Sequence, residues 1–446
     1  MNYTKVFNNA KWIVICKVMQ SLLQLVVGMI TARFLGPSNY GLIKYAASVV
    51  AFAVPFMRLG FDATLVHELV ESPQKESEIM GTSLIMNLIS GFICVGGVTA
   101  FSCIFDAGEK EKILVCLLYS ISLIFAALEM IQYWFQYKLK SKQSSLVMLG
   151  AYCVVTVYKI ILLITSKSVY WFAVSNSVEY AVIAISLIAI YLKNGGKLSF
   201  SFKKGKEMFM KSKHYIFASL MIVVLQNTDH IMITSISGTA ENGFYSAAIT
   251  CTTIVQFVYL AIVDSFRPVI LENKKENSAD FELNVSRLYC ITQYLTVAQS
   301  IVFTVFAKLI VFVLYGENYM ASVPVLQILI WYFSFSIMGT VRNVWILAEQ
   351  KQKYLWIINL SGAVLNVILN AFLIPAWGAC GAAAASLVTQ FVMNFVLGFI
   401  IKPIRENNRL LLKGIDPRFM IKESKNLLTL LKDGLKKKKT PETDKI

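Results

Sequence analysis

The sequence predicts an all-α integral membrane protein, with twelve transmembrane helices in two parallel-repeat six-helix lobes. Composition is the first reason. Of the 446 residues, 57% are hydrophobic and only 15% are charged, whereas soluble domains are about 45–50% apolar and about 25% charged. The second reason is a series of apolar runs, each long enough for the roughly 20 residues that a membrane-spanning helix needs. The third is a hairpin sequence that occurs twice.

Twelve apolar runs are long enough to cross a bilayer. In lipid, only helices and closed barrels satisfy their backbone hydrogen bonds. Barrel strands alternate in hydrophobicity over about ten residues, whereas these runs are continuous, so we expect helices. The expected spans cover residues 12–34, 41–61, 79–101, 113–135, 145–165, 168–192, 215–235, 243–263, 290–314, 324–347, 354–374 and 380–401.

Lysines and arginines gather in alternate loops. The loop after the fourth span reads "YKLKSK", and seven lysines follow the sixth span between 193 and 213. Cytoplasmic loops carry an excess of Lys and Arg, so we expect both termini in the cytoplasm. The loop after the second span, "HELVESPQKESE", is acidic and departs from the pattern, but acidic residues contribute little to it. The expected domains are an N-terminal lobe (1–192), a basic cytoplasmic linker (193–213), a C-terminal lobe (214–401) and a basic cytoplasmic tail (402–446).

Several classes of function are disfavoured by the sequence. A net charge of +16 suggests nucleic acid in a soluble protein, but here the cations lie in loops and in the tail, so no nucleic acid is expected. Eight cysteines are scattered singly without the spacing of a zinc site, and we expect no metal and no cofactor. The phosphate-binding pattern GxxxxGK[ST] is absent, which disfavours an ATP site. The tail segment "NLLTLLKDGLKKKK" is interpreted as an anchor on anionic membrane lipid or as a docking segment for a partner.

The duplicated hairpin reads "LGPSNYGLIKYAA" in the first copy and "SGTAENGFYSAAI" in the second. An even number of expected crossings separates the copies, so they are parallel repeats related by an axis along the membrane normal. The functional site is then expected between the lobes, near the bilayer midplane. Gly36 and Gly41 would form the first hairpin, and Gly238 and Gly243 the second. Pro55 inside the second span would act as a hinge. A shift of 202 residues pairs Gln24 with Gln226, Gly36 with Gly238, Gly41 with Gly243, and Asp62 with Asp264.

Three stretches resemble the bacterial polysaccharide flippases of the multidrug/oligosaccharidyl-lipid/polysaccharide exporter superfamily. They are "RFLGPSNYGLIKYAA…RLGFDATLVHEL", "QNTDHIMITSISGTAENGFYSAA" and "NVILNAFLIPAWGACGAAAASLVTQ". The resemblance covers about residues 5–400 and implies a MATE-like architecture. It also implies movement of an undecaprenyl-diphosphate-linked oligosaccharide across the bacterial cytoplasmic membrane, for O-antigen, capsule or exopolysaccharide assembly. A proton or sodium gradient, or the substrate gradient itself, would drive this movement, and a polysaccharide polymerase or chain-length regulator would be a possible partner.

Polar side chains recur every three or four residues inside the spans, which places them on one face of each helix. The second span carries the stripe Lys44, Ser48, Ala51, Pro55, Arg58 and Asp62. Charges inside a membrane usually mark a pathway, so we expect Lys17, Arg58 and Lys159 to bind the substrate's diphosphate. We expect Gln24 to share their cavity and Tyr133 and Tyr152 to stack on sugars. The alternative for polar and aromatic positions is packing between helices.

Candidates for ion coupling are fewer. Glu129 and Glu179 would either pair with the cations or carry a proton or sodium ion, and Asp229 with His230 would do the same in the seventh span. The pair Asp229–His230 is equally interpreted as a structural contact at a bend. The eleventh span adds the stripe Asn366 and Asn370.

Other classes of membrane protein fit the sequence less well. A drug/cation antiporter of the same superfamily would need more acidic residues than the first lobe carries within its spans. The flippase branch for peptidoglycan precursors would be expected to have more than twelve spans. A membrane enzyme such as a sugar polymerase would need a larger outer loop and paired carboxylates, so we expect no catalytic residues.

Overall fold

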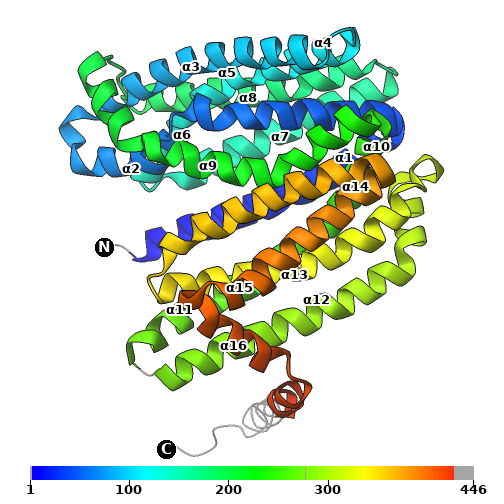
Figure 1. Cartoon of the computed structure of the whole chain (residues 1–446). Helices are drawn as coiled ribbons and strands as arrows, with labels where there is room; N and C mark the ends of the chain where they lie inside the picture. The colour runs from blue at the N-terminus through cyan, green and yellow to red at the C-terminus, as the bar shows by residue number, and fades with distance from the viewer. Residues whose placement is uncertain (1–2, 277, 426–446) are drawn as a thin grey trace, which may run out of the picture. The chain divides into compact units, whose positions relative to one another are not determined.

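The computed structural model describes residues 3–276 and 278–425, and all regular structure in these residues is helical (Figure 1). Apolar helices dominate because lipid offers no hydrogen-bond partners, so the backbone N–H and C=O groups of such a hydrophobic chain must bond to each other. The α-helices are α1 (Tyr3–Arg58), α2 (Phe61–Glu71), α3 (Glu76–Phe105), α4 (Lys110–Ser120), α5 (Ser122–Leu128), α6 (Gln132–Tyr137), α7 (Ser141–Ile164), α8 (Val169–Lys193), α9 (Phe202–Ser237), α10 (Thr239–Thr253), α11 (Gln256–Glu276), α12 (Ser278–Tyr315), α13 (Ser322–Ala348), α14 (Leu355–Phe391), α15 (Leu397–Ile400) and α16 (Arg405–Ile415).

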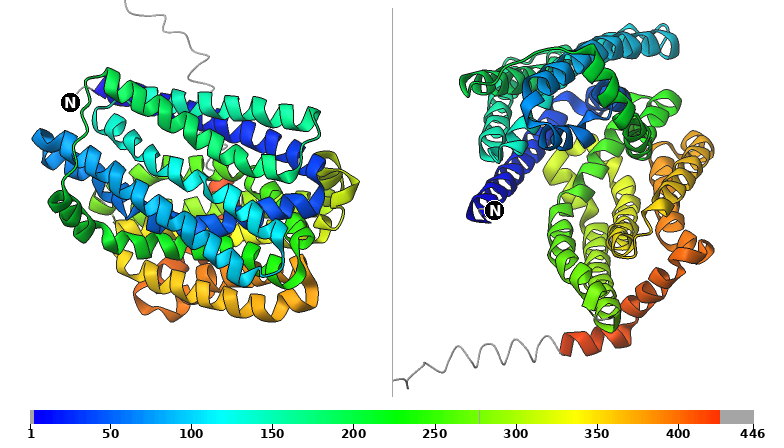
Figure 2. Two further views of the ribbon diagram at one scale, coloured as in Figure 1. Left: turned by 90° about the horizontal axis from the view of Figure 1, so that it is seen from above. Right: turned by 90° about the vertical axis from the view of Figure 1, so that its left-hand side faces the viewer.

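Short helical turns join several of these helices. They comprise the 3₁₀ turns η1 (Pro73–Lys75), η2 (Glu129–Ile131), η3 (Glu317–Tyr319), η4 (Gln352–Tyr354) and η6 (Lys402–Ile404), and the π-helical turn η5 (Val392–Val396). The turn η2 interrupts the run α4–α6, and η5 joins α14 to α15. Figure 2 shows the same helices from two further directions.

Nine helical stretches in the described residues are long and apolar enough to span a membrane, or ten if the bent pair α10–α11 counts as one span. Two of the nine are unusually long, Ile15–Glu71 with 57 residues and Gln352–Ile400 with 49. At 1.5 Å per residue they contain about 85 and 73 Å of helix, against a hydrocarbon core of about 30 Å. Each of the twelve expected spans overlaps one of these helical stretches or the bent pair, and four of them begin or end one to three residues outside it. The protein is therefore a multi-pass helical membrane protein, and the count of twelve crossings stays a prediction.

Glycines break the two longest stretches. Gly36 interrupts α1 at φ 73°, and Gly378 interrupts α14 at φ 53°. The second copy of the repeat behaves as the first does, because α9 ends at Gly238 with φ 96°. Gly36 and Gly238 also share an extended ψ, 171° and 172°. Residues with a Cβ avoid positive φ, so glycine is the residue that lets both hairpins turn.

The two copies of the hairpin pack directly against each other. A Cβ added to Gly41 would collide with the carbonyl of Thr239, and one added to Gly243 would collide with the carbonyl of Pro37. Since Thr239 is the repeat equivalent of Pro37, the two contacts are reciprocal. The Asn242 side chain donates to the Gly41 carbonyl at 2.9 Å. The two copies of the sequence repeat therefore make equivalent contacts with each other.

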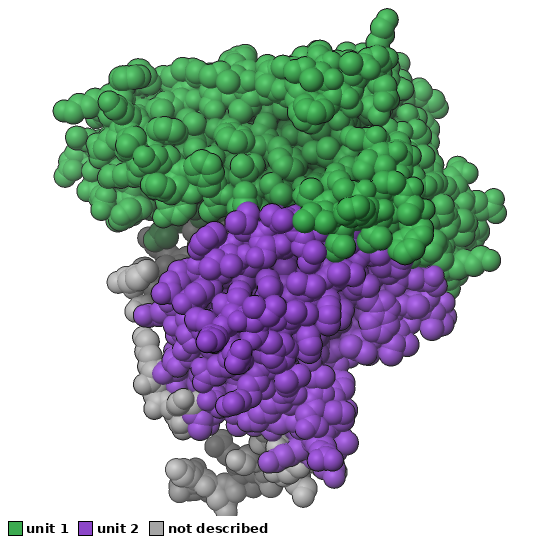
Figure 3. Space-filling view, in the orientation of Figure 1, with its two compact units in different colours: residues 1–250, 308–325, 366–382 green, residues 251–307, 326–365, 383–446 purple. Residues whose placement is uncertain are grey.

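Contact clustering divides the chain into two compact units (Figure 3). Unit 1 comprises residues 1–250, 308–325 and 366–382, and unit 2 comprises 251–307, 326–365 and 383–446. This division does not follow the lobe boundary expected at 193–213, so the two lobes stay a prediction. The expected linker itself is helical from Phe202 onward, because the Ser201 side chain accepts a hydrogen bond from the Lys204 backbone and caps α9.

Many large apolar side chains are exposed on the described helices. Ile104, Phe372 and Ile164 are 71%, 74% and 78% exposed. A soluble protein rarely shows so much apolar surface, whereas a bilayer accepts it. Buried polar side chains occur in both units, but of the six buried charged side chains in the described residues all except Arg342 lie in unit 1, which contains the candidate site.

Candidate functional site

Arg58 is the last residue of α1 and forms an ion pair with Glu129. Leu59 and Gly60 have φ 53° and 72° and end the helix before α2. The Nη2 atom of Arg58 lies 3.3 Å from Oε2 of Glu129 in η2, and Nη1 lies 4.0 Å from Oδ2 of Asp62. The Arg58 and Glu129 side chains are 27% and 13% exposed. The structure therefore places Glu129 beside Arg58, and pairing with a cation was one of the two alternatives that the sequence left open for Glu129.

Two further charges lie on the neighbouring helices of unit 1. Lys159 of α7 and Glu179 of α8 are near enough for their charges to attract each other, and Glu179 is also within electrostatic reach of Glu129. Among the described residues no ion pair within 4.0 Å joins Lys159 to Glu179, so the charge network consists of the Arg58–Glu129 ion pair and these two more distant charges. The tyrosines expected at the site border it, because Tyr133 interacts with Arg58 and Tyr152 is buried beside Glu179.

Lys44 is a further member of this network that was not among the expected binding residues. Its charge acts on Lys159 of α7 and on His230 of α9. The Lys44 ammonium also lies 5.3 Å from the centre of the Tyr40 ring. Its position in the polar stripe of the second span was the signal that pointed to it.

Lys17 and Gln24 stand apart from the network. Both side chains are exposed, and the part of the chain that the structure describes contains no ion pair for Lys17. Pro55 lies inside α1, as expected, and is buried. Two side chains of α3 donate to the adjoining turn: Ser90 to the Phe56 carbonyl at 3.0 Å and Cys94 to the Ala53 carbonyl at 3.6 Å. These contacts satisfy carbonyls in the turn around the proline.

A buried carboxylate forms a second polar centre in unit 1. Asp229 of α9 is 6% exposed. Its Oδ2 accepts from the Tyr245 hydroxyl of α10 and its Oδ1 from the Asn370 amide of α14, both at 2.6 Å. The same Asn370 amide also donates to Oδ1 of Asn366 at 3.1 Å. Side chains of α10 and α14 thus converge on Asp229 of α9 and donate hydrogen bonds to both of its carboxylate oxygens.

His230 points to the duplicated hairpin. Its Nδ1 lies 2.7 Å from Oδ1 of Asn242 and 3.3 Å from the Ser246 hydroxyl. Asn242 in turn donates to the carbonyl of Gly41. The expected pair Asp229–His230 is therefore divided between two sets of partners, and His230 is joined to the contact between the repeats.

The break inside α14 contacts the same hairpin. Glu241 of α10 accepts a hydrogen bond from the Ala379 backbone amide at 2.7 Å. Ala379 follows the break at Gly378, so Glu241 caps the helical segment that begins there. A carboxylate at a helix N-terminus is also favoured by the helix dipole.

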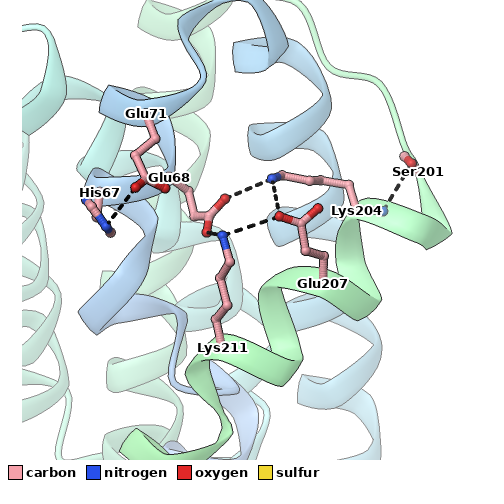
Figure 4. Close-up of polar contacts among 7 residues, drawn as sticks. All are labelled: His67, Glu68, Glu71, Ser201, Lys204, Glu207 and Lys211. Atoms are coloured by element: carbon pink, nitrogen blue, oxygen red, sulfur yellow. Dashed lines mark hydrogen bonds and ion pairs between the residues drawn. The ribbon is translucent and has the colours of Figure 1, made fainter.

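An ion-pair network between α2 and α9 was not anticipated (Figure 4). Glu68 of α2 is 2% exposed and accepts from Lys204 at 2.8 Å and from Lys211 at 2.7 Å. Glu207 lies between these lysines on α9, 3.2 and 3.3 Å away. The spacing of Lys204, Glu207 and Lys211 places them on one face of a helix. Glu68 lies 136 residues from Lys204 in the sequence, and no local sequence pattern predicts that it joins them.

One carboxylate between the spans has a shifted pKa. Burial of Asp106, which follows α3, raises the pKa of its carboxyl group, and the hydrogen bond from Tyr45 only partly offsets this. The Tyr45 hydroxyl lies 2.9 and 3.0 Å from the two carboxyl oxygens. In the described residues, no cluster of three or more His, Cys, Asp or Glu side chains could hold a metal ion.

These features define a multi-pass helical membrane protein with charges inside its spans. The fold is shared with two solved transporters at 14% identity. An inward-facing multidrug MATE transporter of the MOP superfamily has a TM-score of 0.68 over 87% of this chain and 94% of that one. The lipid II flippase MurJ, in an inward closed conformation, has a TM-score of 0.67 over 90% of each chain. The chain thus has the MATE-like architecture that the sequence implied.

Residues 6–274 match the polysaccharide biosynthesis protein family, and the chain belongs to this family. A putative O-antigen transporter of Shigella flexneri is 25% identical over 215 residues, 47% of this chain and 51% of the relative. The matched region thus spans about half of that relative's length. The capsular polysaccharide biosynthesis protein CapF of Staphylococcus aureus is 22% identical over 396 residues, 86% of this chain and 96% of the relative.

Proposed function

We propose that the protein is a flippase for an undecaprenyl-diphosphate-linked oligosaccharide. It would move this repeat unit across the bacterial cytoplasmic membrane for O-antigen, capsule or exopolysaccharide assembly. Membership of the polysaccharide biosynthesis family supports the substrate class. The observation that carries the proposal is the charge network in unit 1, where Arg58 forms an ion pair with Glu129 and Lys159 lies within electrostatic reach of Glu179.

Arg58 and Lys159 are suited to exchange the carboxylates beside them for the diphosphate of the substrate. Glu129 and Glu179 hold Arg58 and Lys159 in place while no substrate is bound. A diphosphate offers several charged oxygens, and the planar guanidinium of Arg58 can contact two of them at once, while Lys159 acts as a point charge. Binding would therefore release the carboxylates from their cations. Tyr133 and Tyr152, which border the network, would then lie beside the sugar.

Exchange of this kind gives a route to ion coupling. A carboxylate left buried without its cation is costly unless it binds a proton or another cation, so Glu129 and Glu179 would take up H⁺ or Na⁺ as the diphosphate arrives. The buried oxygens around Asp229 form a second candidate for cation binding. His230, between Lys44 and the hairpin, would transmit the charge state of this region to the contact between repeats.

The cycle would be one of alternating access. Both termini would lie in the cytoplasm, and the two six-helix lobes would rock about the axis that relates the repeats. The breaks at Gly36 and Gly238, with Pro55, are the expected hinges. The polyprenyl chain would stay in lipid while the diphosphate and sugar cross. Partners in polymerisation and chain-length control would act on the delivered product.

A binding measurement with purified protein tests the substrate site. We expect the wild type to bind undecaprenyl diphosphate more tightly than the uncharged undecaprenol. Arg58→Gln should lower the affinity for the diphosphate by about tenfold or more, as expected for loss of a charge-assisted contact. Arg267→Gln is the matched control, because Arg267 forms an exposed pair with Asp264. Equal binding of the diphosphate by both variants would exclude Arg58 from the site.

A drug/cation antiporter is the second candidate, and the Asp229 centre is the observation that favours it. A buried carboxylate with amide oxygens nearby attracts cations. In the same binding assay, tight binding of a cationic drug that is lost in Asp229→Asn, together with no preference for the diphosphate, would establish the antiporter instead.

A further inference from the structure

We propose that unit 2 carries a binding site for an anionic phospholipid, formed by α11, α12 and the segment 402–425. This site is separate from the substrate network in unit 1, and its existence does not depend on the function proposed above. The inference rests on a groove, on the order of side chains along α12, and on the charge of the segment that borders the groove.

The groove has a volume of about 520 Å³, within the range of small-molecule sites. Phe266 of α11, Ile291 and Leu295 of α12, and Met420 supply its apolar surface. The remaining lining residues are Asn284, Arg287, Cys290, Tyr294, Glu423 and Ser424. An apolar surface with a few polar groups at defined positions is typical of a ligand site.

Along α12, the side chains that line the groove change from polar to apolar, as a phospholipid changes from its headgroup to its acyl chains. Asn284 and Arg287 lie near the start of the helix, and Ile291 and Leu295 follow on the same face toward the middle of the span. Asn284 and Leu295 are about 16 Å apart along the axis, at 1.5 Å per residue. A polar headgroup at Arg287 would therefore place an acyl chain along Ile291 and Leu295.

The segment that borders the groove is amphipathic. The buried face consists of Ile404 at the end of η6 and, on α16, Asn407, Asn408, Leu410, Leu411 and Gly414. Close packing on α12 explains Gly414, because a Cβ there would lie 2.6 Å from the Ser286 carbonyl oxygen and 2.8 Å from Cβ of Tyr289. The Tyr294 hydroxyl donates to the Ile415 carbonyl at 2.7 Å. These contacts hold α16 against α12, beside the groove (Figure 1).

The helical turns that follow α16 complete the groove. Residues 417–425 are helical, and Asp416 caps them by accepting from the Arg418 backbone amide at 2.8 Å. Nε of Arg287 donates to Oε2 of Glu423 at 2.7 Å. This ion pair joins the segment to α12 and holds the guanidinium at the polar end of the groove.

The outward face of this segment is cationic. Between residues 402 and 422 every Lys and Arg side chain is exposed, and the acids there are only Glu406 and Asp416. An amphipathic helix with a basic outer face binds anionic lipid at the membrane surface, and each cation near the surface adds to this attraction. The basic face does not line the groove; its cations would instead raise the concentration of anionic lipid beside the groove and so favour an anionic phospholipid over a zwitterionic one. The six cations are Lys402, Arg405, Arg409, Lys413, Arg418 and Lys422.

Native mass spectrometry of the purified full chain tests the charge requirement. The probes are phosphatidylglycerol and phosphatidylcholine with identical acyl chains. We expect the wild type to bind phosphatidylglycerol about tenfold more tightly. The fourfold variant Arg409→Gln, Lys413→Gln, Arg418→Gln and Lys422→Gln should lose most of this preference. The control removes four exposed lysines elsewhere, through Lys193→Gln, Lys197→Gln, Lys203→Gln and Lys206→Gln, and should keep it.

A second pair of variants tests the groove. Leu295→Trp fills the groove and should abolish the tightly bound phosphatidylglycerol. Val305→Trp lies on the same helix, outside the groove, at a position that is 69% exposed, and should bind lipid as the wild type does. A wild-type preference in the fourfold variant, or a retained tight adduct in a folded Leu295→Trp protein, would overturn the proposal.

Discussion

At the scale of single residues, the account depends on charges placed where lipid would make them costly. Arg58, Glu129 and Glu179 all lie within helices that are long and apolar enough to span a membrane. Removing one partner of a buried ion pair leaves a charge without compensation, whereas removing both leaves none. The pairs therefore fix the positions of cations that a substrate anion would need.

The Arg58–Glu129 pair can be measured by a double-mutant cycle. We expect Arg58→Gln and Glu129→Gln each to lower the free energy of unfolding by roughly 2 kcal/mol, below the range for fully buried pairs because both side chains are partly exposed. The double variant should recover a large part of that loss. Thermal unfolding in detergent gives the four values. Strictly additive losses would mean that the two side chains do not interact.

Asp106 predicts a pH dependence of stability. Burial raises the pKa of its carboxyl group above the unfolded value of 3.8, so between these two values the folded state binds more protons than the unfolded state. Stability from this group is therefore fully present below pH 3.8 and is lost as the pH rises through the native pKa. Unfolding measured across this range should show that loss in the wild type and not in Asp106→Asn. An identical pH profile for both proteins would refute the assignment.

At the scale of helices, the hairpins and the contacts between them are the informative elements. Glycine recurs at equivalent positions because each copy presents its backbone to the other. The glycine pattern was readable in the sequence, since both hairpins carry the same spacing. The direct contact between the copies was not, because sequence similarity says nothing about which repeat surfaces touch.

Alanine substitutions test the contact between the repeats. Gly41→Ala and Gly243→Ala each place a methyl group against a backbone carbonyl that cannot rotate away, and each should cost about 1–3 kcal/mol. Gly28→Ala and Gly97→Ala are matched controls, because an added Cβ at either position meets nothing within 4 Å. They should be neutral or stabilising by up to about 1 kcal/mol. Equal melting temperatures for all four would contradict the close approach.

The network of Figure 4 gives a second test at this scale. Glu68→Gln leaves the buried Lys204 with only the exposed Glu207 as a partner, so we expect a loss of about 3 kcal/mol. Glu71→Gln, on the same helix, removes an exposed carboxylate that pairs with His67 at 3.3 Å, and should change stability by less than about 0.5 kcal/mol. Thermal unfolding separates the two. A loss in Glu71→Gln as large as in Glu68→Gln would show that the cost does not come from burial.

At the scale of the whole molecule, much of the fold was predictable. Apolar runs located every long helix, because a helix in lipid needs a continuous apolar stretch of known length. The resemblance to polysaccharide flippases is confirmed by family membership. The partners in the candidate site were less accessible to prediction. Arg58 and Glu129 were each noticeable as charges within apolar runs, but their contact joins residues 71 positions apart, and only the packed structure brings them together.

The structure also changes the interpretation of the tail. From the sequence, residues 402–446 formed one basic extension. The part now described, up to residue 425, contains α16 and a further helical segment, and its buried face packs on α12. The stretch "NLLTLLKDGLKKKK" lies entirely outside the described residues. Asn407 and Asn408 are buried on α16, although the sequence had indicated a soluble tail from residue 402 onward.

The central claim is that this chain moves a lipid-linked oligosaccharide from the inner to the outer leaflet. Deleting the gene and analysing the extracted membrane lipids tests it most directly. The account predicts that an undecaprenyl-diphosphate oligosaccharide accumulates on the cytoplasmic leaflet while the surface polymer disappears, and that the wild-type gene, but not Arg58→Gln, restores the polymer. Normal polymer, no accumulation and a new sensitivity to cationic drugs would contradict the flippase and identify an antiporter.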